Sequence, residues 1–122
     1  MMKSLSAVIV TAFVLAPHLT AQSLAVGTWT GTMTPPQKSA AAVTYEVTGT
    51  GDSLAVTMVI PGHRAPFSHI RWVEGKLLFE WTAGDTLVKC ELSKQGNGGY
   101  RGPCTDAEGG TGQLDMVPPA KP

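Results

Sequence analysis

The chain has no excess of charge of either sign. Among its 122 residues, lysine and arginine together number 9, and aspartate and glutamate together also number 9. A protein that binds nucleic acid neutralises phosphates with a surplus of basic side chains, and this sequence has no such surplus. Blocks of like charge, which mark interaction tails, are missing too. The composition therefore argues against nucleic acid as a partner.

Sequence motifs of catalysis are also missing. The chain contains no nucleophile-elbow glycine pattern, no phosphate loop and no dinucleotide fingerprint. Ser68 and His69 are adjacent, but neighbouring residues on a strand point to opposite faces, so they make a poor pair of nucleophile and base. A zinc site needs three or four converging ligands, which His63 and His69 alone do not supply. We therefore expect a non-catalytic protein that holds no metal and no other cofactor.

The apolar run near the N-terminus is too short to span a membrane. Residues 5–15 are uncharged and mostly apolar, and they follow a positive start at Lys3. This run is about half of the ~20 residues that a spanning helix needs. Pro17 follows it, and Ala21 offers a small residue for cleavage, which is the order found in secretory signals. We therefore predict a cleavable signal over residues 1–21, in preference to a membrane anchor or a core helix, and a secreted or periplasmic protein with no membrane span after its removal.

Cysteine is scarce, because the chain contains only Cys90 and Cys104. An even number of cysteines in an exported protein indicates a disulfide. The two residues flank the turn-rich stretch 95–99, and a hairpin there brings them opposite, or nearly opposite, each other. We predict a Cys90–Cys104 disulfide that contributes about 3 kcal/mol to stability.

Long stretches of good helix formers are absent, whereas glycine and proline are common, with 14 and 9 residues. Apolar and polar residues alternate in short segments between turn signals, which is typical of strands that are wetted on one side. We predict an all-β domain over residues 22–117 and a proline-rich tail over 118–122. The eight candidate strands are 26–33, 43–48, 54–60, 67–73, 76–82, 86–93, 100–104 and 112–117.

Two turn signals predict how neighbouring strands align. A two-residue turn at 74–75 pairs Trp72 with Leu77 and Ile70 with Phe79. All four side chains then share the inner face, as cross-strand packing requires. The same register places Ser68 opposite Trp81 on the inner face, and His69 and Arg71 on the outer face.

The second turn signal lies at residues 50–51. It pairs Val47 with Leu54 and Tyr45 with Val56, again on one apolar face. Two separate turns therefore give consistent inner faces.

The connections predict a closed or nearly closed barrel. None is long enough for a crossover helix, so consecutive strands are antiparallel and form an up-and-down meander. A meander of eight strands leaves two exposed edges unless the sheet closes on itself. A sandwich of two sheets is the alternative, but it uses longer crossing connections than this sequence contains.

The predicted connections differ between the two ends of the barrel. Tight turns at 50–51, 74–75 and 97–98 share one end. The other end, which we call the predicted looped end, collects the segments 34–41, 61–66, 83–85 and 105–110. Binding residues often lie on loops above a rigid scaffold, although loops that are merely solvated give the same pattern.

Aromatic side chains of the barrel interior and two polar side chains of the segment 61–66 are the candidate ligand contacts. The candidates are Tyr45, Trp72, Phe79, Trp81, His63 and Arg64. A barrel of eight strands either fills with its own side chains or holds one small ligand, and mid-sized inner residues permit both. We expect binding of a small apolar molecule or part of a partner protein at the predicted looped end. The alternative is a secreted protein-binding or inhibitory module with a fully packed barrel.

The motif Gly27-Thr28-Trp29 on the first strand resembles the lipocalins and the wider calycin superfamily, which includes the avidins. The long segment after this strand is similar to the lid loop of lipocalins. The resemblance implies a small ligand-binding barrel in which Trp29 packs across the closed end. Glycine at position 27 also lets the strand bend sharply, and a large ring fills a barrel end. The later lipocalin motifs and the C-terminal lipocalin helix have no counterpart in this chain.

Overall fold

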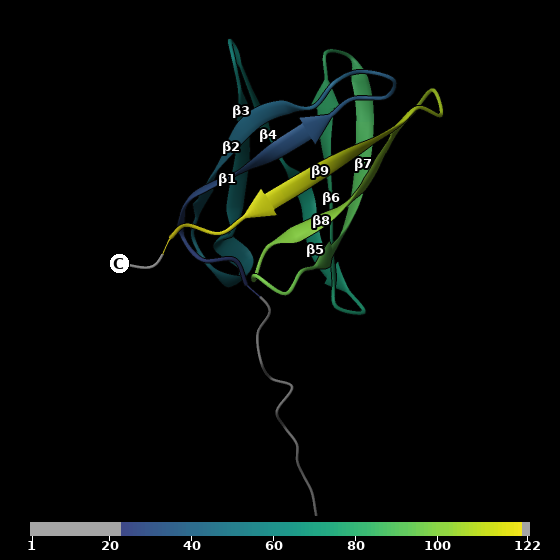
Figure 1. Cartoon of the computed structure of the whole chain (residues 1–122). Helices are drawn as coiled ribbons and strands as arrows, with labels where there is room; N and C mark the ends of the chain where they lie inside the picture. Colours follow the sequence, from purple (N-terminus) through teal and green to yellow (C-terminus); the bar gives the residue numbers. More distant parts are fainter. Residues whose placement is uncertain (1–22, 121–122) are drawn as a thin grey trace, which may run out of the picture.

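A computed structural model of the chain describes residues 23–120, so the predicted signal over 1–21 lies outside the described residues (Figure 1). Within 23–120, no helix is long and apolar enough to cross a membrane. The predicted all-β fold is confirmed, with nine strands in place of the eight that the sequence predicts. They are β1 (Gly27–Thr34), β2 (Ala41–Thr48), β3 (Ala55–Ile60), β4 (His63–Pro66), β5 (Ser68–Val73), β6 (Lys76–Ala83), β7 (Thr86–Lys94), β8 (Tyr100–Asp106) and β9 (Thr111–Val117), with one 3-10 turn, η3 (Gly51–Ser53), between β2 and β3.

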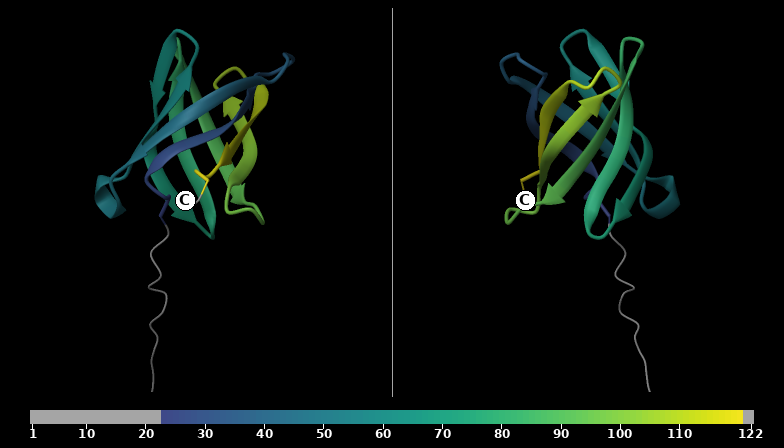
Figure 2. Two further views of the ribbon diagram at one scale, coloured as in Figure 1. Left: turned by 60° about the vertical axis from the view of Figure 1, so that its left-hand side comes forward. Right: turned by 90° about the vertical axis from the view of Figure 1, so that its right-hand side faces the viewer.

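The strands form a single antiparallel sheet in the order β4-β3-β2-β1-β9-β8-β7-β6-β5. The edge strands β4 and β5 are consecutive in the chain and are joined at Phe67, whose backbone N–H donates to the carbonyl of Val56 at 2.8 Å. The chain from His63 to Val73 thus pairs first with β3 and then with β6. This arrangement brings the two edges together, and the sheet wraps into a nearly closed barrel (Figure 2).

The prediction of a loop over residues 61–66 is wrong. His63–Pro66 forms β4, and only residues 61–62 lie between β3 and β4. Ala65 is buried opposite Met58. Such a short edge strand ending in proline carries little alternation, so turn signals from the flanking prolines dominate its sequence.

The register of β5 against β6 agrees with the prediction near the turn and departs from it further along. Trp72 lies opposite Leu77, as expected, but a β-bulge between Ser68 and Arg71 shifts the rest. Ser68 is consequently opposite Glu80 and exposed, where the sequence predicts an inner position opposite Trp81. His69, in the bulge, has φ of +53° and faces outward as predicted. A bulge adds one unpaired residue, which strict alternation does not reveal.

The register of β2 against β3 differs from the prediction by two residues. Val47 lies opposite Val56 and Tyr45 opposite Met58. The cause is η3, which makes this connection longer than a two-residue turn. A shift of two residues keeps every side chain on its predicted face, so the predicted inner-facing residues of β2 and β3 remain inner-facing.

Side chains fill the barrel interior. The largest fully buried ones are Trp29, Tyr45, Phe79, Met58, Leu77, Leu92, Leu114, Met116 and Val47. The rings of Phe67 and Phe79 stack with centroids 3.9 Å apart, and the Tyr45 hydroxyl donates to the backbone carbonyl of Asp115 at 2.9 Å. The middle of the barrel is therefore a packed core.

Glycine is required at one position where β1 pairs with β9. A Cβ added to Gly31 would lie 1.7 Å from the carbonyl oxygen of Asp115. No side chain fits there without moving backbone, so the close approach of these two strands depends on Gly31.

The predicted disulfide is confirmed. Cys90 on β7 lies directly opposite Cys104 on β8, and their sulfur atoms are bonded. The bond ties two neighbouring strands of the barrel wall together.

Candidate functional site

The barrel has an upper and a lower end, named as drawn in Figure 1. The upper end is the predicted looped end and carries the connections β1–β2, β3–β4, β6–β7 and β8–β9; the lower end carries β2–β3, β5–β6 and β7–β8. The expected contrast in loop length is wrong, because residues 49–54 and 95–99 make lower connections as long as the upper ones. What distinguishes the two ends is the chemistry of the residues that border each.

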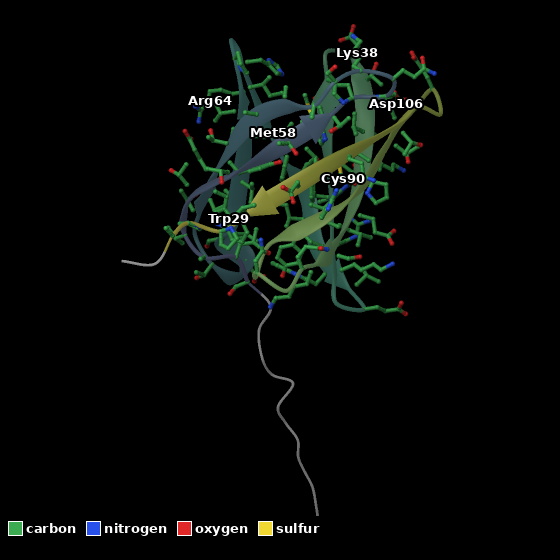
Figure 3. The ribbon with its side chains drawn as sticks, viewed as in Figure 1. Trp29, Lys38, Met58, Arg64, Cys90 and Asp106 are labelled. Atoms are coloured by element: carbon green, nitrogen blue, oxygen red, sulfur yellow. A yellow bond between two sulfur atoms is a disulfide. The ribbon has the colours of Figure 1, made fainter. Side chains whose placement is uncertain are left out.

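Part of the lower end is filled by buried side chains. Trp29 is 2% exposed, and its indole Nε1 donates to the carbonyl of Ala25 at 2.8 Å. Leu24, just before β1, is buried as well. The start of the proline-rich tail also reaches this end, since a Cβ on Gly27 would lie 3.2 Å from Cγ of Pro119. Figure 3 shows Trp29 near this end.

The upper end contains a pocket of about 270 Å³, which we call the upper pocket. It is bordered by β1, β6, β7, β8 and β9, which are neighbours in the sheet. The residues that line it are Met33, Thr34, Pro35, Pro36, Trp81, Ala83, Thr86, Val88, Cys104, Asp106, Glu108, Gly110, Gly112, Gln113 and Leu114.

The walls of the upper pocket are inward-facing side chains at the upper ends of strands. Trp81, Val88 and Leu114 are buried and come from β6, β7 and β9. One inner position deeper, Phe79 on β6 and Met116 on β9 are fully buried. The upper pocket is therefore the mouth of the barrel, and the packed core forms its floor.

The rim of the upper pocket is held by contacts within and between loops. Oδ1 of Asp106 accepts the backbone N–H groups of Glu108 at 2.9 Å and Gly110 at 2.8 Å, which fixes the β8–β9 turn. A Cβ on Gly110 would lie 3.0 Å from Cγ of Pro36, so this turn packs closely against the β1–β2 connection. The mouth is thus shaped before any ligand arrives, as in most small-molecule sites.

The charge at the upper pocket has one sign. Among the described residues that line it, Asp106 and Glu108 are the charged ones, and none is lysine, arginine or histidine. Lys38, on the β1–β2 connection, is exposed at the upper end but does not line the pocket (Figure 3). The mouth therefore combines apolar walls with an acidic rim.

The structure brings one of the six predicted ligand contacts, Trp81, into the upper pocket. Tyr45 and Phe79 are buried in the core, at 0% and 1% exposure. His63 and Arg64 are exposed on β4, where Arg64 forms an ion pair with Glu46 of β2. Arg64 points away from the face of β4 that buries Ala65, and His63, at the first position of the strand, is exposed and does not line the upper pocket.

Trp72, the sixth candidate, lines a different pocket of about 330 Å³ at the lower end, at the seam where the β2–β3 connection faces β5. We call it the seam pocket, and its lining is Gly51, Asp52, Leu54, Phe67, Ser68, His69, Ile70 and Trp72. The indole Nε1 of Trp72 donates to the hydroxyl of Tyr100, at the start of β8, at 3.4 Å. Trp72 and Trp81 therefore belong to separate pockets.

Two polar side chains beside the seam pocket, those of His69 and Arg71, already have partners. Nδ1 of His69 lies 3.3 Å from Oε1 of Glu80, and Nη1 of Arg71 donates to the carbonyl of His69 at 2.7 Å. No group of three or more His, Cys, Asp or Glu in residues 23–120 is placed to hold a metal ion. The seam pocket is thus bordered by exposed polar groups that bond with each other.

Two titratable groups outside the mouth have shifted pKa values. Burial raises the pKa of Tyr45 well above its usual range, and the charge of Asp115 adds to this effect. The hydrogen bond from Arg64 lowers the pKa of Glu46. The first shift follows from burial of the Tyr45 phenol, and the second follows from the ion pair with Arg64 on the outer wall.

Sequence reasoning missed several wall residues of the upper pocket, among them Thr86, Val88 and Leu114. The available signal was positional: each occupies an inner position near the upper end of its strand. Tyr45 and Phe79 are candidates because they are aromatic, but they lie too deep in the barrel core to contact a ligand in the upper pocket.

Comparison of the chain with protein-family models gives no match, and neither does comparison with curated proteins. Neither comparison identifies a family for this nearly closed meander barrel, so the site is interpreted from its own residues.

Proposed function

We propose that this protein is an exported, lipocalin-like barrel that binds a small apolar molecule in its upper pocket and catalyses no reaction. The observation that supports this proposal best is the position of the pocket, at the mouth of the barrel, with mostly apolar walls above a packed core. Its volume of about 270 Å³ is close to the ~300 Å³ at which small-molecule pockets typically begin.

The lining chemistry supports an apolar occupant. Met33, Pro35, Pro36, Val88 and Leu114 offer mostly carbon surface. Removing such surface and the ligand's own apolar surface from water is favourable by about 25 cal/mol per Å². The packed floor limits the ligand to a compact molecule, because a long chain cannot pass Phe79.

A variant that fills the mouth tests the proposal. Ala83 is exposed and lines the upper pocket, so Ala83→Phe adds a ring at the rim without removing a core side chain. We expect binding of propylbenzene and similar small aromatics, measured by calorimetry, to weaken at least tenfold in this variant.

Ala55→Phe is the matched control, since Ala55 is exposed on β3 and does not line the upper pocket. We expect it to bind as the wild-type protein does. Equal binding by both variants, or no binding of any apolar compound by the wild-type protein, would contradict the proposed function.

A second function, binding of a partner protein, is favoured by the packed interior. If the core excludes ligands and the upper rim presents Pro35, Pro36 and Glu108 to a partner, the same end serves as a contact surface. Affinity capture from the native secretome with wild-type protein and Ala83→Phe discriminates the two. A stoichiometric partner lost in the variant supports protein binding, whereas a small-molecule binder recovers none.

A further inference from the structure

The three tryptophans differ in how their indole N–H groups are paired. The Nε1 of Trp29 donates to Ala25, and that of Trp72 donates to the Tyr100 hydroxyl. The Nε1 of Trp81 is buried and has no hydrogen-bond partner among the described residues. Trp81 is the tryptophan that lines the upper pocket.

An unpaired buried donor is costly, and native proteins leave few of them. Trp81 is 8% exposed and sits in a wall that is otherwise made mostly of carbon. A ligand atom that accepts a hydrogen bond from Nε1 removes this cost, and its own interaction is strong because the surroundings are apolar.

The acidic rim gives the upper pocket a second basis for discriminating between ligands, which is their charge. Asp106 and Glu108 are the charged residues that line the mouth, so an anionic group on the ligand meets repulsion there. A compact aryl carboxylate is therefore disfavoured, although the apolar walls would otherwise suit its ring.

We propose that the upper pocket selects uncharged compounds that combine a compact apolar body with one hydrogen-bond acceptor, such as an aryl ketone, and that Trp81 Nε1 is the group that recognises the acceptor. This inference rests on the proposed function. Nε1 of Trp81 has almost no exposed surface. We therefore expect the indole to move slightly toward the pocket when the ligand enters.

Three compounds of nearly the same size and skeleton test the inference by calorimetry: propiophenone, propylbenzene and 3-phenylpropionate. We expect the wild-type protein to bind propiophenone about fivefold more tightly than propylbenzene, as one added hydrogen bond predicts. We expect 3-phenylpropionate to bind most weakly, and Glu108→Gln to improve its binding about twofold at low salt.

Trp81→Phe keeps an aromatic ring and removes the donor. We expect it to bind propiophenone and propylbenzene equally, whereas Trp72→Phe, the matched control outside the upper pocket, keeps the preference. In the wild-type protein, the indole N–H resonance of Trp81 should move downfield with propiophenone and not with propylbenzene, a result that does not require any variant to fold.

The outcomes separate the two proposals. Equal binding of propiophenone and propylbenzene by the wild-type protein overturns the recognition of an acceptor and leaves the proposed function standing. Absence of binding by all three compounds overturns both.

Discussion

The two ends of the barrel have similar connections but differ in the residues that border them. At the lower end, Leu24, Trp29 and Pro119 fill one part with buried or tightly packed side chains, and the seam pocket, which has polar borders, occupies another part. At the upper end, inner positions of five strands leave a pocket of about 270 Å³ with mostly apolar walls. The packing around Trp29 contributes to folding, and the upper pocket leaves apolar surface for a ligand. Loop length, which is comparable at both ends, does not explain this division of roles.

Truncation of the lower plug has the largest expected effect. Trp29→Ala removes a buried ring and its hydrogen bond to Ala25, and it should lower the free energy of unfolding by about 3–5 kcal/mol. Urea unfolding measures this loss. Ligand affinity of the folded variant should stay within about twofold of wild type, because Trp29 does not line the upper pocket.

Glu108→Ala at the upper rim is the control for this comparison. Glu108 is exposed, and the substitution should change stability by no more than about 0.5 kcal/mol. Similar losses of unfolding free energy in the two variants would contradict a stabilising role that is specific to the lower end.

Loss of the disulfide has the next largest effect and bears on the upper end. Replacing Cys90 and Cys104 together by alanine opens a cross-link with a sequence separation of 14, which should cost about 3 kcal/mol in urea unfolding. Cys104 also lines the upper pocket, so ligand binding should weaken as well. Unchanged affinity would show that the mouth keeps its shape without this covalent support.

The pH dependence of stability tests whether the core below the upper pocket is dry. Burial raises the pKa of Tyr45, so this side chain stays protonated in the folded state while it ionises near pH 10 in the unfolded state. The unfolded state then binds fewer protons, and stability falls as pH rises above about 10, by at most ~1.4 kcal/mol per pH unit.

Tyr45→Phe isolates this contribution from other groups that titrate at high pH. The variant loses the hydrogen bond to Asp115, which lowers stability at neutral pH, but its stability should decline less steeply above pH 10. Parallel pH profiles for variant and wild type would mean that water reaches Tyr45 and that the mouth extends deeper than described.

The smallest effect is expected on the outer wall. Arg64→Ala removes an ion pair between side chains that are about half exposed, and such pairs contribute little to stability. The pKa of the Glu46 carboxyl, followed by NMR titration, should rise because the hydrogen bond that lowers it is lost. A clear loss of ligand affinity would instead place the candidate residue Arg64 in the site.

Much of the barrel can be predicted from the sequence, because strand alternation and turn signals depend on residues that are close together in the chain. Alternation and the turn at 74–75 place Trp72 opposite Leu77, and the spacing around residues 95–99 places Cys90 opposite Cys104. The errors in register arise where one extra residue enters a strand or a short helical turn enters a connection. The bulge at His69 and η3 both change register in ways that alternation does not record.

The candidate site is less predictable than the fold. Alternation predicts Trp81 as an inner aromatic residue, but nothing local distinguishes it from Phe79, which lies one inner position deeper in the packed core. The depth of each position depends on how all strands are staggered in the closed barrel. Pocket walls such as Val88 and Leu114 become visible only once that stagger is known.

The most direct test of ligand binding in the upper pocket is an NMR chemical-shift map of the isotope-labelled protein titrated with propiophenone. We predict perturbed resonances along the upper pocket, at residues 33–36, 81–88 and 104–114, with none at Leu24 or Trp29. Perturbations centred on Trp29 or on the seam pocket around Trp72 would contradict this prediction.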